Sequence, residues 1–190
     1  MKKRVGILGG TFNPPHIGHL IIANEVYHAL GLEEIRFMPN AIPPHKKMDF
    51  RVTGKQRITM LELAIGNCSF MKVEELELKK GGTSYTFDTI ELLRQREPDS
   101  EFFFIIGGDQ VEYLPNWYRI DELVQIVQLV GVARPHTSLQ TAYPIKIVEI
   151  PQIDVSSTEI RRRFENRKTT KYLVPDAVRE YIEREKLYEI

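Results

Sequence analysis

Short apolar runs alternate with longer segments of helical periodicity along the chain, and this alternation constrains the fold more than any other sequence feature. Strands are expected at residues 4–8, 34–38, 71–78, 101–106, 129–133 and 145–150, and helices at residues 17–30, 56–65, 86–96, 159–166 and 175–186. Repeated strand–helix alternation is typical of a parallel sheet with helices on both faces. We therefore predict an α/β fold, a doubly wound parallel sheet in three α/β/α layers with additional C-terminal helices.

Length and charge narrow the class of protein. The 190 residues fit one domain, 1–190, whose C-terminal helical part covers about 156–190. Lys plus Arg and Asp plus Glu both number 26, which gives a formal net charge of zero. This balance argues against nucleic acid as a partner and against docking on an anionic membrane. A single cysteine, Cys68, excludes an intrachain disulfide, and no apolar window approaches the ~20 residues of a membrane span. A cytoplasmic location is expected.

The loop after the first strand is the strongest candidate site, because ligands of such sheets bind beyond the carboxyl ends of the strands. It reads Gly9-Gly10-Thr11-Phe12-Asn13-Pro14-Pro15-His16-Ile17-Gly18-His19. The paired glycines let backbone amides approach a phosphate. His16 and His19 share a helix face, and Gly18 between them leaves room for a ligand. The loop has neither the Walker ending nor the dinucleotide fingerprint.

A second anion site is predicted where a late helix begins, in Val155-Ser156-Ser157-Thr158-Glu159-Ile160-Arg161. Ser156 and Glu159 have the spacing of a capping box. A helix N-terminus with hydroxyls and exposed amides attracts anions, and Arg161 adds a charged donor. Taken alone, the segment is also compatible with an ordinary capped helix.

Further candidates follow other strands or open a helix. Lys46, in Pro43-Pro44-His45-Lys46 after the second strand, offers a point charge to a phosphate. Ser84-Tyr85-Thr86 opens a helix whose amides could hold a carboxylate, although ordinary capping explains the same pattern. Asp109, in Gly107-Gly108-Asp109, follows the most apolar strand, where a carboxylate can bind ribose. No His/Asp/Glu cluster has the spacing of a metal site.

The first loop closely resembles the T/H-x-G-H signature of the nucleotidyltransferase superfamily, and most of all bacterial nicotinate mononucleotide adenylyltransferases. Val155-Ser156-Ser157-Thr158-Glu159-Ile160-Arg161 is similar to their I-S-S-T-x-I-R motif, with Val155 in place of Ile. The resemblance covers roughly residues 4–188 and implies a Rossmann-like fold. It implies catalytic roles for His16, His19 and Arg161. It implies ATP contacts by Gly9, Gly10, Thr11, Gly18, Gly107, Asp109, Arg134, Ser157 and Thr158. It implies mononucleotide contacts by Asn40, Lys46, Tyr85, Thr86 and Trp117.

The activity implied by this resemblance is transfer of AMP from ATP to nicotinate mononucleotide, with Mg²⁺ carried by the ATP phosphates. The partners are then ATP and nicotinate mononucleotide, and the oligomeric state stays open, a homodimer included. Nicotinamide mononucleotide and phosphopantetheine are alternative acceptors. A non-catalytic nucleotide sensor on the same fold is a third reading. A fragment related to class I aminoacyl-tRNA synthetases is disfavoured, because the chain lacks a Lys-Met-Ser-Lys-Ser segment and net positive charge.

Overall fold

The structure is a computed structural model that describes residues 2–44, 51–133 and 139–189. Six parallel strands form one sheet in the order β3-β2-β1-β4-β5-β6. The strands are β1 (Lys3–Gly10), β2 (Glu34–Pro39), β3 (Met71–Val73), β4 (Ser100–Gly107), β5 (Gln128–Val132) and β6 (Ile145–Val148). The helices are α1 (Ile17–Leu30), α2 (Gly54–Ile65), α3 (Leu76–Lys80), α4 (Thr86–Arg96), α5 (Gly108–Tyr113), α6 (Ile120–Ile126), α7 (Ser157–Glu165) and α8 (Asp176–Arg184), with a short 3-10 helix η1 (Leu114–Asn116). The predicted fold class is confirmed.

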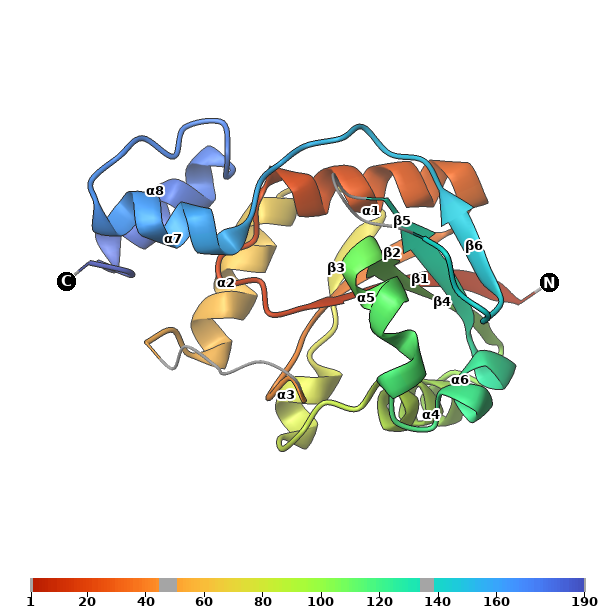
Figure 1. The fold of residues 1–190 in the computed structure, drawn as a ribbon. Helices are drawn as coiled ribbons and strands as arrows, with labels where there is room; N and C mark the ends of the chain where they lie inside the picture. The colour runs from red at the N-terminus through yellow and green to blue at the C-terminus, as the bar shows by residue number, and fades with distance from the viewer. Residues whose placement is uncertain (1, 45–50, 134–138, 190) are drawn as a thin grey trace.

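Helices cover both faces of the sheet, and the strand sequences explain why. Along β4, Phe102, Phe104 and Ile106 face the cluster that contains residues of α4 and α6, whereas Phe103 and Ile105 face the cluster of α1. This alternation with period two buries apolar side chains on both faces, as a central parallel strand requires. Figure 1 shows α1 on one side of the sheet and α4 and α6 on the other.

Strand order reverses at the centre of the sheet. β1 pairs with β2 on one side and with β4 on the other, both in parallel. The chain thus winds outward in two directions from β1, and a crevice opens at the carboxyl ends of β1 and β4. The loop of residues 11–16 leaves β1 at this point.

The C-terminal helices form a third apolar cluster with α2. Met60 of α2 packs with Ile160 of α7 and with Val178 and Ile182 of α8, all fully buried. In Figure 1 these two helices lie at the end of the molecule opposite the N-terminus. This contact brings the start of α7 back to the first loop, more than 140 residues earlier in the chain.

The sequence prediction is wrong in two segments. The strand predicted for 71–78 ends at Val73, and α3 occupies 76–80. The reason is Glu74, whose carboxylate pairs with Arg36 and Arg96 and accepts the backbone N–H of Leu76 at the start of α3. Residues 108–126, where no element is predicted, hold α5, η1 and α6, all of seven residues or fewer.

Candidate functional site

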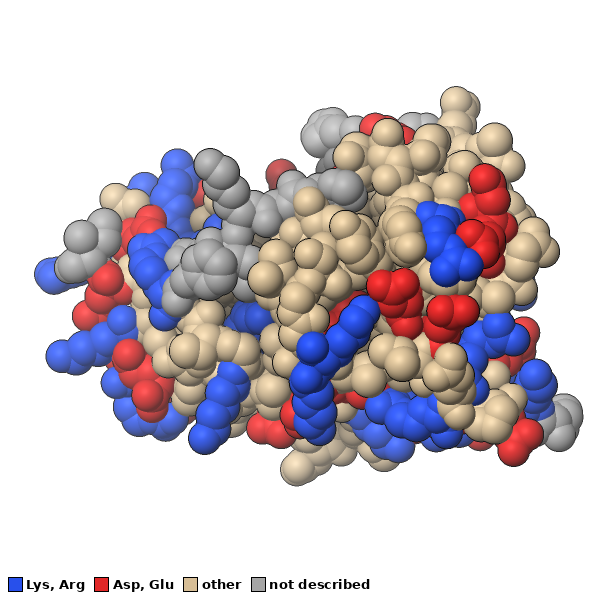
Figure 2. Space-filling model, turned by 90° about the horizontal axis from the view of Figure 1, so that it is seen from below, with Lys and Arg blue, Asp and Glu red and all other residues tan. Residues whose placement is uncertain are grey.

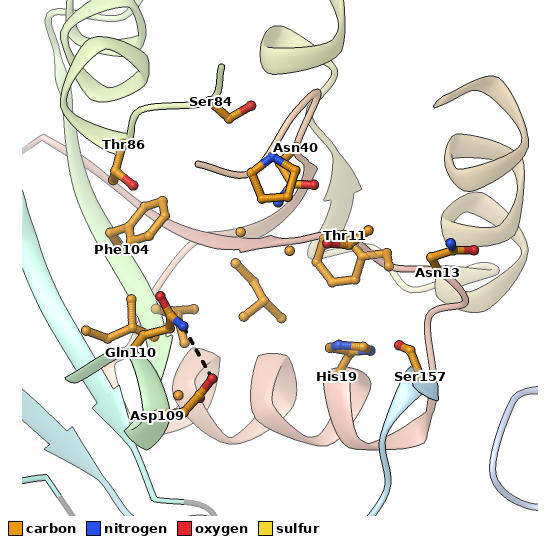
Figure 3. Close-up of a pocket in the computed structure, with 18 of the residues that line it drawn as sticks. Thr11, Asn13, His19, Asn40, Ser84, Thr86, Phe104, Asp109, Gln110 and Ser157 are labelled. Atoms are coloured by element: carbon orange, nitrogen blue, oxygen red, sulfur yellow. Dashed lines mark hydrogen bonds between the residues drawn. The ribbon is translucent and has the colours of Figure 1, made fainter. Parts of the chain in front are cut away.

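A cavity of about 420 Å³ opens at the carboxyl ends of β1 and β4. Its wall includes residues at the starts of α1, α4 and α7, and Figure 3 shows this arrangement. The first N–H groups of a helix have no partner within the helix, and the helix dipole gives that end a partial positive charge. Three helices of nine or more residues therefore direct anion-binding ends toward one space.

The first loop is tightly packed, which explains its glycines. A Cβ on Gly10 would lie 3.0 Å from the ring of Phe12, and a Cβ on Gly9 would lie 3.0 Å from the ring of Phe104. Phe12 has a left-handed backbone (φ 48°) that its buried ring holds in place, between Phe37 and His19. The backbone of the loop thus borders the cavity directly.

The two histidines stack on each other at the start of α1. Their ring centroids are 3.7 Å apart, and His16 is only 4% exposed. The backbone N–H of His16 donates to Nδ1 of His19 at 3.1 Å, so the hydrogen-bond network assigns the proton of a neutral His19 ring to Nε2. A Cβ on Gly18 would meet the His16 ring at 3.1–3.2 Å. The space that Gly18 leaves is therefore used by His16 itself.

The start of α7 is fastened to the first loop. Ser156 caps the helix by accepting the N–H of Glu159 at 3.2 Å, while the Glu159 carboxylate pairs instead with Arg162 and Arg163. The Ser157 hydroxyl donates to the carbonyl of Pro14 at 2.8 Å. Arg161 donates to the carbonyl of Asn13 at 2.7 Å and to Thr158 at 3.3 Å. Figure 3 draws His19 and Ser157 at one end of the cavity.

The opposite end is built by two other segments. The Ser84 hydroxyl accepts the N–H of Ala41 at 3.0 Å, and the Ser84 N–H donates to the carbonyl of Ile42 at 2.9 Å. Figure 3 places Asn40, Ser84 and Thr86 at this end. Behind them Glu77 is 5% exposed and accepts the hydroxyl of Thr89 at 2.9 Å. Burial raises the pKa of Glu77, against the hydrogen bonds from Ser84 and Thr89.

Aromatic and carboxylate side chains complete the wall. Trp117 follows η1 and packs edge to face on Phe104, with centroids 6.1 Å apart. Tyr85 and Tyr118 lie 4.8 Å apart at the rim. Asp109 is exposed on α5, and its carboxylate accepts a hydrogen bond from Gln110 at 3.3 Å, drawn as a dashed line in Figure 3.

The structure brings nearly all the predicted site residues to this one cavity. Those that line it are Gly9, Gly10, Thr11, His16, His19, Asn40, Tyr85, Thr86, Gly107, Asp109, Trp117, Ser157, Thr158 and Arg161. Gly18 does not line it. Lys46 and Arg134 lie outside the described residues. Sequence reasoning missed Glu77, because the segment that contains it is predicted as a strand.

The wall carries little positive side-chain charge of its own. Among the lining residues that the structure describes, Arg161 is the single Lys or Arg, while Glu77 and Asp109 are acidic. On the outer face seen in Figure 2, below α3 and α4, basic and acidic side chains are interspersed. An anionic ligand would therefore depend on helix N-termini and on charge behind the wall.

Among residues 2–44, 51–133 and 139–189, no three His, Cys, Asp or Glu side chains gather as a metal site would require. In the same part of the chain, no helix is long and apolar enough to pass through a bilayer.

Comparison with known proteins gives a consistent result. The cytidylyltransferase-like family profile matches residues 7–163. Over 187 residues the chain is 51% identical to the nicotinate-nucleotide adenylyltransferase of Bacillus subtilis, covering 98% of this chain and 99% of that one. It is 54% identical over 187 residues to the probable nicotinate-nucleotide adenylyltransferase of Bacillus cytotoxicus, with the same coverage. The solved Plasmodium falciparum nicotinic acid mononucleotide adenylyltransferase complexed with NaAD shares the fold, with a TM-score of 0.84 at 20% identity over 98% of this chain and 97% of that one.

Proposed function

Because the chain belongs to the nicotinate-nucleotide adenylyltransferases, a family of nucleotidyltransferases, we propose that it transfers AMP from ATP to nicotinate mononucleotide. A phosphate oxygen of the mononucleotide attacks the α-phosphorus of ATP. The bond from that phosphorus to the bridging oxygen breaks, and pyrophosphate leaves. The product is nicotinate adenine dinucleotide, a precursor in NAD biosynthesis.

The observation that carries the proposal is the meeting of α1, α4 and α7 at one cavity, with His16, His19 and Arg161 in its wall. Transfer of a nucleotidyl group needs positioning and charge stabilisation more than a protein nucleophile. Helix N-termini and N–H donors supply both. The assignment of the His19 proton to Nε2 supports a role as hydrogen-bond donor to a phosphate oxygen.

The two ends of the cavity support two substrate subsites. The end with Thr11, His19, Ser157 and Arg161 suits the triphosphate, because it combines two helix starts with charged and hydroxyl donors. The end with Tyr85 and Thr86 suits the mononucleotide, since the start of α4 can hold a carboxylate and Trp117 can stack on a pyridine ring. Asn40 lies at this end as well (Figure 3).

We assign Mg²⁺ to the ATP phosphates, not to a protein cage. Magnesium keeps several of its waters and needs few protein ligands when a nucleotide carries it. Asp109 is an exposed carboxylate in the cavity wall, and a single such group suits an ion that the nucleotide holds through its phosphates. When bound, the ion would neutralise charge on the departing pyrophosphate.

The test is an acceptor screen. The protein is incubated with ATP and Mg²⁺, and nicotinate mononucleotide, nicotinamide mononucleotide and phosphopantetheine are offered separately while pyrophosphate is measured. We expect release with nicotinate mononucleotide, well above the other two. Release only with phosphopantetheine, or with none of the three, would refute the proposal.

A further inference from the structure

Arg57 is a buried cation that forms no ion pair with the acidic side chains that the structure describes. Arg57, on α2, is 2% exposed, and no acidic side chain among residues 2–44, 51–133 and 139–189 forms an ion pair with it. Its Nη1 donates to the carbonyl of Thr11 at 2.9 Å, and its Nε is buried without a hydrogen-bond partner. Burial lowers the pKa of Arg57. An uncompensated buried cation destabilises the fold, so its presence points to a use outside folding.

The partner of Arg57 belongs to the first loop. A peptide unit is planar and normally trans, so its C=O and N–H point in opposite directions. The carbonyl of Thr11 is directed at Arg57, behind the cavity wall, which turns the N–H of Phe12 away from Arg57. Thr11 and Phe12 both line the cavity, whereas Arg57 does not.

The same peptide lies in a conformation that needs support. Phe12 has φ 48°, a region that bulky residues rarely occupy, and the residue is 1% exposed. The loop is also held from the C-terminal side, where the hydroxyl of Tyr188 donates to the Asn13 side chain and Arg161 donates to the Asn13 carbonyl. Arg57 is the group that fixes the Thr11–Phe12 peptide itself.

We propose that Arg57 is a positioning residue for ATP. Arg57 orients the Thr11–Phe12 peptide so that the N–H of Phe12 faces the nucleotide phosphates. The bound triphosphate in turn supplies the negative charge that balances Arg57. This role of Arg57 extends the proposed function, and it rests on the first loop being the site that binds the ATP phosphates. It also explains how a cavity with one described Lys or Arg in its wall attracts a polyanion, because a positive charge lies one peptide behind that wall.

The experiment compares Arg57→Met with Arg36→Met, the same change at a buried arginine that is fully paired. Arg36 is 8% exposed and contacts the carboxylates of Glu34, Glu74 and Glu97. The melting temperature is measured with and without ATP, and kcat and KM for ATP and for nicotinate mononucleotide are measured at saturation of the other substrate. Arg57→Lys tests rescue by charge.

We expect Arg57→Met without ligand to melt no more than about 2 °C below wild type, while Arg36→Met melts well below it. Its kcat/KM for ATP should fall on the order of 10²-fold, with KM for the mononucleotide within about threefold of wild type. ATP should raise its melting temperature less than it raises that of wild type. Arg57→Lys should recover at least about tenfold in kcat/KM for ATP.

Three results would overturn the proposal. The first is an Arg57→Met protein with wild-type kcat/KM for ATP. The second is an Arg57→Met protein that is destabilised as much as Arg36→Met, because such a loss of stability indicates a structural role for Arg57. The third is an undiminished melting shift with ATP. The ATP shift needs no acceptor, so a wrong acceptor assignment leaves this test intact. A wild-type protein that shows no ATP shift refutes the proposed function as well.

Discussion

Arg36 and Arg57 are both buried arginines, and their surroundings differ completely. Arg36, on β2, makes a bidentate pair with Glu97 at 2.7 Å and also pairs with Glu34 and Glu74. Arg57, on α2, donates a hydrogen bond to the carbonyl of Thr11 and lies close to Tyr188, and among the described residues no carboxylate pairs with it. Around Arg36 the buried positive and negative charges pair with each other within the protein, and buried ions need such pairing if the fold is to be stable. The surroundings of Arg57 leave a charge uncompensated next to a cavity, as expected where a ligand completes the site.

The two arginines lie in different parts of the molecule. The network around Arg36 joins β2 to the ends of β3 and α4 and includes Lys3, Lys72 and Arg96 on its rim. The region around Arg57 joins α2 to the first loop and to the C-terminal helices. If the first is structural and the second functional, changes in the two regions should affect different measurements.

The largest effect on stability is expected for Arg36→Met. Removing the central cation leaves three carboxylates close together without their main partner, which should cost about 3–5 kcal/mol in the free energy of unfolding. The measurement is urea denaturation. Turnover per folded molecule should stay within about twofold of wild type. A loss below about 1 kcal/mol would show that the pairing contributes little.

The largest effect on turnover is expected for His19→Ala. Loss of one group that stabilises transition-state charge typically lowers kcat on the order of 10²–10³-fold. The melting temperature should change little, because His19 is only partly buried. His28→Ala, on the exposed end of the same helix, is the matched control and should keep near-full activity. Near-full turnover of His19→Ala would remove the role assigned to it.

Acid should weaken the ion-pair network around Arg36. Burial alone would raise the pKa of Glu34, but hydrogen bonds from Lys72, Lys3 and Arg36 outweigh it and lower that pKa to about 2. Hydrogen bonds from Arg36 lower the pKa of Glu97 to about 2, against burial. These shifts stabilise the fold above the unfolded value of 4.5, and the stabilisation is lost as pH falls toward 2.

The corresponding measurement is urea denaturation between pH 6 and pH 3. Wild type should lose about 3 kcal/mol of unfolding free energy over the acid limb. Arg36→Met should show a flatter dependence, since its carboxylates have lost the cation that lowers their pKa. Parallel curves for the two proteins would contradict the assignment.

Ser157→Ala should give the smallest effect. It removes the hydroxyl that donates to Pro14 at 2.8 Å and so loosens α7 from the first loop. We expect about 1 kcal/mol of lost stability and up to about a tenfold fall in kcat/KM for ATP. Chemical denaturation and steady-state kinetics measure the two effects. A change in KM for the mononucleotide alone would place Ser157 at the wrong end of the cavity.

The sequence predicted those parts of the fold whose signals are local. The helix 17–30 is found with the predicted bounds, because its apolar stripe ends at Gly31, which adopts the left-handed conformation of a C-terminal cap. The start of α7 was likewise indicated by Ser156, one residue before the helix. Most candidate site residues line one cavity because parallel strands end at the same edge of the sheet.

What sequence could not reveal depends on contacts between distant residues. The strand at 71 ends early because Glu74 meets Arg36 and Arg96, which lie 38 and 22 residues away. Arg57 lies on the buried face of α2 with Met60 and Leu61, and a charged residue in this otherwise apolar stripe is the sequence feature that marks Arg57 as unusual. The role of Arg57 is visible only in the structure, where its side chain is within hydrogen-bond distance of Thr11, 46 residues away in the sequence.

The most direct test of the central claim is a crystal structure with a non-hydrolysable ATP analogue and Mg²⁺. The triphosphate should lie between the starts of α1 and α7, within hydrogen-bond distance of Nε2 of His19 and of the N–H of Phe12, with the Arg57–Thr11 bond retained. A triphosphate bound at the Tyr85–Thr86 end, or outside the cavity, would contradict the account.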